Sequence, residues 1–220
     1  MPDKIRVWDL PTRIFHWSLA VALAGLVTTA SIGGNAMPWH FRCGYLVLSL
    51  LLFRLCWGLV GGHWSRFASF AYSPKTALLY LKGQGLPEQS IGHNPAGSFS
   101  VFAMLGFLLL QVGTGLFSDD EIAAAGPGAR FVSNSWVSLA TQYHAEVGKI
   151  IVLGLVALHI GAILFYRFKR GENLVSAMIL GDKESSSVLK SSRDDRASRW
   201  LAVGLFVACA SLVAWLVSLA

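Results

Sequence analysis

Four of the six histidines in this sequence lie in or at the ends of strongly apolar stretches. An ionisable or metal-binding side chain is costly inside a membrane, so its presence there usually marks a functional site. Neutral imidazole is the commonest metal ligand among side chains, and it ligates the iron of many haem proteins. The first chemistry to consider is therefore ligation of haem iron by these four side chains, which are His16, His40, His144 and His159.

The apolar stretches that carry the histidines are long enough to cross a membrane, because a bilayer core requires roughly 20 apolar residues of helix. Five stretches contain no charged residue other than Arg54: 14–41, 43–62, 95–118, 150–166 and 200–220. Helices of soluble proteins carry a polar face that these stretches lack. A soluble domain of 220 residues is also too small to bury five of them. The sequence therefore predicts an all-α membrane protein with five transmembrane helices.

The basic residues predict the orientation of these helices. Lys and Arg gather in the N-terminal tail, between the second and third stretches, and after the fourth. The alternate connections are poor in them, since 33–39 has none and 119–142 has only Arg130. Basic connections stay on the cytoplasmic side, so the N-terminus is expected in the cytoplasm and the C-terminus outside. The net charge of +6 is thereby explained without a nucleic-acid partner.

The depths of the four histidines predict two pairs. His144 and His159 are 15 residues apart, which is about 22 Å along a helix, and they leave it on one broad face. His40 begins the second helix on the outer side, and His16 lies near the inner start of the first. His40 therefore pairs with His144, and His16 with His159. A four-helix transmembrane bundle holding two haems, each with two axial imidazoles, would result.

The remaining two histidines are not expected to bind haem, and the cysteines indicate that the haem is held without a covalent bond. His63 and His93 fall in predicted inner loops without a partner at the same depth. The cysteines form neither a CxxC pair nor a CxxCH attachment site, so the expected cofactor is haem b. The cysteines are Cys43, Cys56 and Cys209.

Three basic residues near the histidines are candidates for pairing with a haem propionate. Arg54 lies 14 residues after His40, at the expected depth of the inner haem, where its guanidinium can bind a carboxylate. The alternative for Arg54 is a side chain that snorkels to the inner interface. Lys149 could neutralise an outer propionate or face a quinone pocket, and Arg42 could reach the outer propionate from the rim.

The residues beyond the fourth helix form a separate part of the chain. The segment 181–198 is polar and rich in serine, and the helix that follows has no histidine. We predict a di-haem membrane domain over 1–170, a cytoplasmic polar linker over 171–198, and an additional transmembrane helix over 199–220. On this division, a chain ending after Gly171 should keep both haems.

Several segments resemble the prokaryotic cytochrome b561 family, which includes the b-type cytochrome subunits of nickel-iron hydrogenases. The most specific are RIFHW at 13–17, GHNPAG at 92–97, YHAEVG at 143–148 and ALHIGAILFYR at 157–167, within a similarity that spans about 6–170. The resemblance implies a four-helix core in a bacterial inner membrane and electron exchange with quinone. It also implies two b haems on the residues matching His16, His40, His144 and His159.

One spacing departs from that family. In most members the two histidines of the fourth helix are 14 residues apart, whereas His144 and His159 are 15 apart. Either a π-bulge or a position of His144 just before the helix would accommodate the extra residue.

Two axial imidazoles fill the coordination sphere of iron, which favours electron transfer over oxygen activation. We therefore predict transmembrane electron transfer between a quinone and a partner, either a c-type cytochrome or a dehydrogenase or hydrogenase subunit. The alternative is a self-sufficient superoxide:quinone oxidoreductase, although the acidic outer residues Asp119, Asp120 and Glu121 disfavour an anionic substrate. A transporter with a histidine relay would be colourless, so one absorption spectrum excludes or supports that third class.

Overall fold

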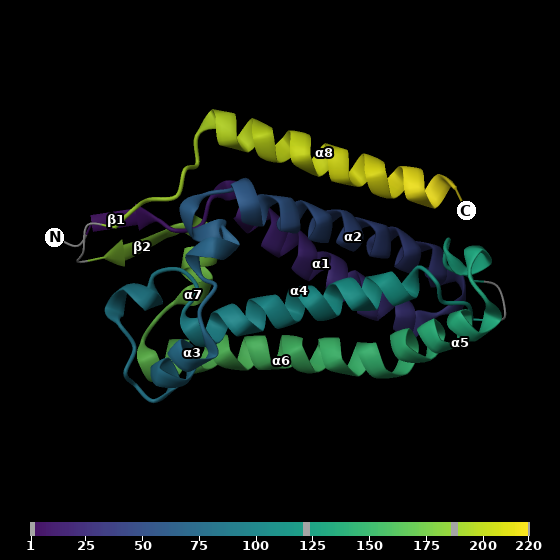
Figure 1. The fold of residues 1–220 in the computed structure, drawn as a ribbon, viewed down its shortest axis with the longest axis horizontal. Helices are drawn as coiled ribbons and strands as arrows, with labels where there is room; N and C mark the ends of the chain where they lie inside the picture. The colour runs from purple at the N-terminus through teal and green to yellow at the C-terminus, as the bar shows by residue number, and fades with distance from the viewer. Residues whose placement is uncertain (1–2, 121–123, 186–188, 220) are drawn as a thin grey trace. The chain divides into compact units, whose positions relative to one another are not determined.

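The computed structural model describes residues 3–120, 124–185 and 189–219. Within these residues, five helical segments are long and apolar enough to cross a membrane (Figure 1). They are α1 (Leu10–Ile32), α2 (Met37–Val60), α4 (Pro95–Gly115), the continuous segment Asn134–Arg170, and α8 (Arg196–Ser218). The prediction of an all-α membrane protein with five spanning helices is confirmed.

Three of these helices begin directly after a polar residue that caps them. Asp9 accepts a hydrogen bond from the backbone N–H of Thr12 at 2.8 Å, which caps α1. Asn94 caps α4 through the N–H of Gly97 at 2.7 Å, and Asp195 caps α8 through the N–H of Ser198 at 2.7 Å. A side-chain oxygen at this position satisfies a backbone donor that has no partner within the helix. Local sequence therefore determines where the spans start.

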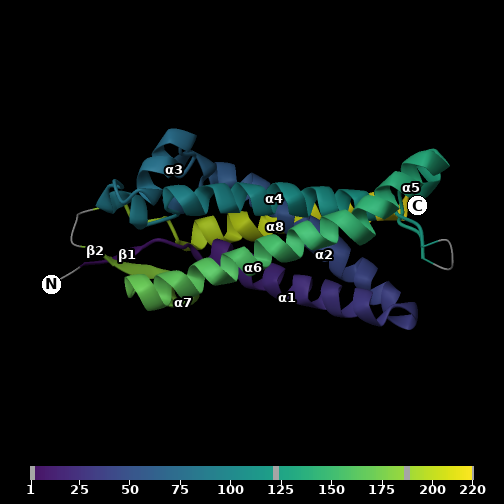
Figure 2. The same ribbon diagram turned by 90° about the horizontal axis from the view of Figure 1, so that it is seen from below.

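The fourth span is longer than predicted. It consists of α5 (Asn134–Gln142), a π-helical turn (Tyr143–Gly148), α6 (Lys149–Phe165) and a second π-helical turn (Tyr166–Arg170). Figure 2 shows α5 leading through the turn into α6. The sequence analysis treated 119–142 as a connection between spans, and the residues of α5 are more polar than those of the membrane-spanning stretches. A helix that extends beyond an apolar span carries no such hydrophobic signal.

The chain divides into two compact units. The first contains Met1–Phe15, Arg54–Ala103 and Ala157–Leu205. It holds α3 (Pro74–Leu81), α7 (Leu174–Leu180) and a two-stranded antiparallel sheet of β1 (Asp3–Arg6) and β2 (Asp182–Ser185) (Figure 1). Its buried core is formed by Ile5, Val7, Trp8 and Ala177. The sheet was not predicted, because neither four-residue strand has a hydrophobic alternation of its own.

The described residues of segment 171–198, which was predicted to be a polar linker, are part of this first unit. It supplies α7 and β2, and its Ser192 donates from Oγ to the main-chain oxygen of Val7 at 2.8 Å. The indole of Trp64 donates to the main-chain oxygen of Lys190 at 2.8 Å. Arg6 forms an ion pair with Asp182 at 2.9 Å. The segment is polar because its side chains cap and pair backbone groups of the N-terminal region.

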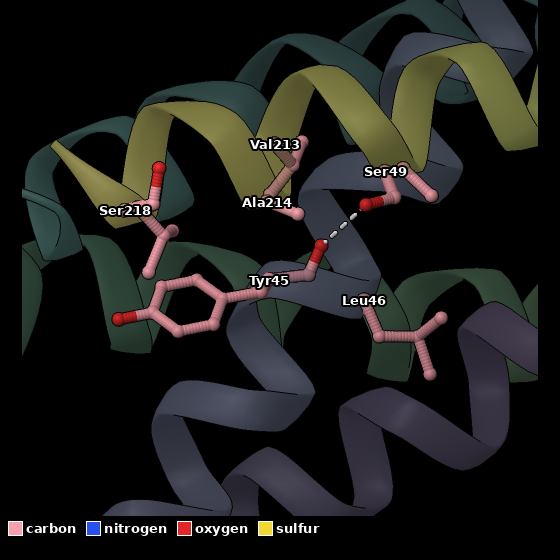
Figure 3. Close-up of a pocket in the computed structure, with 8 residues that line it drawn as sticks. Tyr45, Leu46, Ser49, Val213, Ala214 and Ser218 are labelled. Carbon is pink, nitrogen blue, oxygen red and sulfur yellow. Dashed lines mark hydrogen bonds between the residues drawn. The ribbon is translucent and has the colours of Figure 1, made fainter.

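The second unit contains His16–Phe53, Met104–Val156 and Phe206–Ala220. Here α2 and α8 line an open apolar pocket of about 380 Å³ (Figure 3). Ser49 on α2 donates from its hydroxyl to the main-chain oxygen of Tyr45 at 2.8 Å, so this hydroxyl is satisfied within its own helix. The pocket therefore offers mainly hydrocarbon contacts, as expected for a surface that faces lipid tails.

Candidate functional site

His40 and His144 face each other in the second unit. His40 lies in the first turn of α2, and His144 lies in the π-helical turn that precedes α6. Their ring centroids are 6.1 Å apart and their planes are at 87°. Two imidazoles bound to opposite sides of one metal ion, with metal–nitrogen bonds of about 2 Å, hold their ring centres about 6 Å apart. The separation of these two rings suits a shared metal ion, which supports the outer pair predicted from the sequence.

The hydrogen bonds of both rings prepare the other nitrogen for a metal. Nδ1 of His144 lies 2.8 Å from the main-chain oxygen of Gln111, and Nδ1 of His40 lies 3.1 Å from that of Leu26. A carbonyl oxygen can only accept, so each Nδ1 carries the hydrogen and each Nε2 keeps its lone pair. Histidines that bind metals usually donate a hydrogen bond from the N–H of their second ring nitrogen in this way, which fixes the tautomer and the ring orientation.

The spacing of 15 residues between His144 and His159 is accommodated by the π-helical turn. A π-helical turn takes up one more residue than an α-helical turn. His144 lies inside it, since the turn covers Tyr143–Gly148. A π-bulge was one of the two arrangements expected from the sequence, and it is the one found. Such turns are often associated with functional sites.

Gly115 on α4 provides the space that the ring of His144 occupies. A Cβ at this position would lie 2.7 Å from Cε1 and 2.9 Å from Nδ1 of His144. Contacts this short would displace the ring, because neither α4 nor the ring can move away without breaking the bond to Gln111.

We therefore expect Gly115→Ala to weaken haem binding at the outer site. Forcing an extra carbon into a packed site costs about 1–3 kcal/mol. The affinity of the outer site for haem should therefore fall roughly tenfold or more, while the rest of the chain folds. The haem content of the purified variant measures this. Gly113→Ala is the matched control, because a Cβ at Gly113 meets no atom within 4 Å. Equal haem contents in the two variants would contradict the expectation.

Arg54 in the first unit carries a buried positive charge. The residue is 3% exposed, and among the described residues its Nη1 has no hydrogen-bond partner. Its guanidinium carbon lies 4.7 Å from the centre of the Phe67 ring. A side chain that snorkels would reach water, so this burial argues against that alternative. A buried guanidinium nitrogen without a partner suits an anionic group, as the predicted haem propionate would provide.

Asp9 organises the surroundings of Arg54 and was not singled out from the sequence. The residue is fully buried, and besides capping α1 it accepts hydrogen bonds from three groups near the end of α2. The donors are the indole of Trp57 at 3.1 Å, the backbone N–H of Gly62 at 3.0 Å and the hydroxyl of Ser65 at 2.7 Å. Its carboxylate also interacts electrostatically with the guanidinium of its neighbour Arg54. An acidic residue directly before an apolar helix was the available signal, since it marks an N-cap.

The other predicted residues are distributed over both units. His16 lies on α1 in the second unit and His159 on α6 in the first, both half-buried, so their pairing stays a prediction. The guanidinium carbon of Arg42 lies 4.7 Å from the centre of the Trp39 ring, and Lys149 is exposed at the start of α6.

The two histidines predicted to lie in loops have aromatic surroundings in the first unit. The ring of His93 lies 4.6 Å from that of Trp8 and 4.4 Å from that of Phe70, as expected for a packing role. His63 contacts Trp64 edge-on, and partial burial, together with two nearby basic residues, lowers its pKa.

The acidic segment that the sequence predicts on the outer side is partly described. The backbone N–H of Asp119 donates to the hydroxyl of Thr141 at 3.0 Å, and Asp120 accepts from the backbone N–H of Ala124 at 2.8 Å. Glu121, the third residue of the predicted acidic group, lies outside the described residues.

Comparison with known proteins gives one family. The family model described as prokaryotic cytochrome b561 matches residues 7–181. Similar proteins include a probable Ni/Fe-hydrogenase B-type cytochrome subunit of Rhizobium leguminosarum bv. viciae, 23% identical, with 82% of this chain and 89% of the relative covered. A probable Ni/Fe-hydrogenase 1 B-type cytochrome subunit of Escherichia coli K12 is 24% identical over 80% of this chain and 88% of its own. No solved structure matches the chain significantly. The resemblance seen in the sequence motifs is confirmed.

Proposed function

This chain belongs to the prokaryotic cytochrome b561 family, and from that premise we propose that it transfers electrons across a bacterial inner membrane between a quinone and a hydrogenase. The chain is a membrane b-type cytochrome that functions in electron transfer. The observation that carries the proposal is the pair of His40 and His144, whose rings lie 6.1 Å apart with both Nδ1 atoms bonded to carbonyl oxygens.

We propose two haem b groups as the cofactors. His40 and His144 would hold the outer one, and His16 and His159 the inner one, with Arg54 neutralising an inner propionate. Bound haem iron supplies one-electron oxidation and reduction, and two imidazole ligands leave it no open position. The protein's own contribution is to fix each ring through its second nitrogen and to place buried positive charge beside the propionates.

The proposed partner follows from the relatives. Those from R. leguminosarum and E. coli are named as probable cytochrome subunits of Ni/Fe-hydrogenases. A hydrogenase on the outer side would deliver electrons to the haem at His40 and His144, and the basic inner segments keep the N-terminus in the cytoplasm and the C-terminus in the periplasm.

Haem content and quinol chemistry of the purified chain test this function. We expect two haems per chain, all removed by acid–acetone because the sequence has no CxxCH site. Under anaerobic conditions, the reduced protein should be reoxidised by a soluble quinone analogue, as followed by haem absorbance. A colourless protein would refute the cytochrome function, and a haem-to-protein ratio near one would refute the second haem. Absence of reoxidation would remove quinone from the proposal.

A further inference from the structure

Gln111 on α4 contacts His144 in two ways. Its main-chain oxygen accepts from Nδ1 of the ring at 2.8 Å, and its side-chain Nε2 donates to the main-chain oxygen of His144 at 2.9 Å. The main-chain oxygen of His144 can only accept, so the amide of Gln111 must present its nitrogen to it. One residue of α4 therefore holds both the ring and the backbone of the predicted ligand.

The neighbourhood of Gly148 leaves room for this amide. The side-chain oxygen Oε1 of Gln111 is buried without a partner among the described residues, and it faces the backbone of Gly148. A Cβ at position 148 would clash with this oxygen. Gly148 is the last residue of the π-helical turn, so the turn and the amide occupy this space together. A buried acceptor without a donor is costly, which indicates that the bond from Nε2 to the main-chain oxygen of His144 keeps the amide in this position.

The π-helical turn is the feature that these bonds stabilise. An isolated π-helical turn is rare because α geometry is the more favourable one. If the turn relaxed to α geometry, its extra residue would become part of the regular α-helix. His144 would then rotate by about 100° around the helix axis relative to α6. Its ring would then leave His40. A bond from a neighbouring helix to the carbonyl of His144 opposes that rotation.

We propose that Gln111 is a positioning residue for the outer haem, because its side-chain amide holds the π-helical turn that orients His144 toward His40. The inference rests on the proposed function, since it requires His144 to be an axial ligand. It adds that this ligand depends on a hydrogen bond from a residue 33 positions earlier in the chain.

Gln111→Met tests the proposal in the full-length chain. Methionine has a similar length and removes both the donor and the buried oxygen without a partner, so the loss is confined to the bond with His144. We expect retention of the outer haem to fall about tenfold or more, as for other residues that orient metal ligands. The inner haem should remain and reports that the chain is folded. Gln142→Met is the matched control, because Gln142 is exposed at the end of α5. The readouts are haem content and the reduced-minus-oxidised spectrum.

Deletion of Val147 tests the mechanism. Val147 is 47% exposed within the turn, and its removal should convert the turn to α geometry without moving the helical segments on either side. The deletion alone should keep the outer haem. Combined with Gln111→Met it should restore the outer haem, because a turn without the extra residue no longer needs the bond.

Four results distinguish the possibilities. Restoration of the outer haem in the combined variant supports the proposal. An unchanged outer haem in Gln111→Met, or a loss that the deletion does not restore, overturns it. Full retention of the outer haem in His144→Ala would instead refute the ligand assignment in the proposed function, so the two failures are distinguishable.

Discussion

Alanine at His40 and alanine at His144 should remove the same spectral component of the protein. Each substitution would leave the iron of the proposed outer haem with one protein ligand, and loss of one of two axial imidazoles should release that haem or make it high-spin. The centres of the two rings lie 6.1 Å apart, and the Nδ1–H of each ring donates a hydrogen bond to a main-chain carbonyl oxygen. Neither variant should affect the proposed inner haem, because the sequence places His159 about 22 Å from His144 along the helix. Low-temperature difference spectra and haem content measure the loss.

The same expectation applies to the second predicted pair of ligands and the inner haem. His16→Ala and His159→Ala should both remove the remaining spectral component, since the sequence places these residues at one depth. His63→Ala is the control, because His63 lies outside the spanning helices and its ring packs against Trp64. If His16→Ala removed the same component as His144→Ala, the topology or the pairing would be wrong.

Two truncations of the chain should differ strongly in stability. A chain ending after Gly171 loses α7 and β2, and with them the contacts of Ala177, Lys190 and Ser192 with the N-terminal region. It exposes part of the core around Val7 and Trp8, at about 1.5–3 kcal/mol for each large apolar side chain returned to water. A chain ending after Asp195 keeps all of these contacts and loses α8 alone.

We therefore expect the shorter chain to unfold at a Tm lower by roughly 10 °C and to lose haem on purification. The chain ending after Asp195 should keep both haems. Thermal unfolding followed by haem absorbance compares the two. The sequence suggested Gly171 as the boundary of the haem-binding part, whereas the contacts of 171–195 move the expected boundary to Asp195. Equal Tm values for the two truncations would show that the folded linker contributes nothing to stability.

The sequence by itself determined the membrane fold and the candidate ligands. A charge-free stretch of about 20 residues has one stable form in a bilayer, because every backbone group must be paired within the segment. Caps such as Asp9 and Asn94 lie next to the helices they begin, so local sequence also specifies the helix starts. Histidines in such stretches are recognisable as functional because burying them without a partner is costly.

Only the tertiary structure decided how the ligands are held. The bond from Gln111 to His144 joins residues 33 positions apart, and that from Ser192 to Val7 joins residues 185 apart. Arg54 is recognisable from the sequence as a charge in a span, but its burial against Phe67 depends on a chain reversal after α2. Hydrophobic periodicity reports which face of a segment is apolar and carries no information about its partner. Side-chain hydrogen bonds between helices form only after those helices pack, so the features that orient His40 and His144 follow from the packed fold.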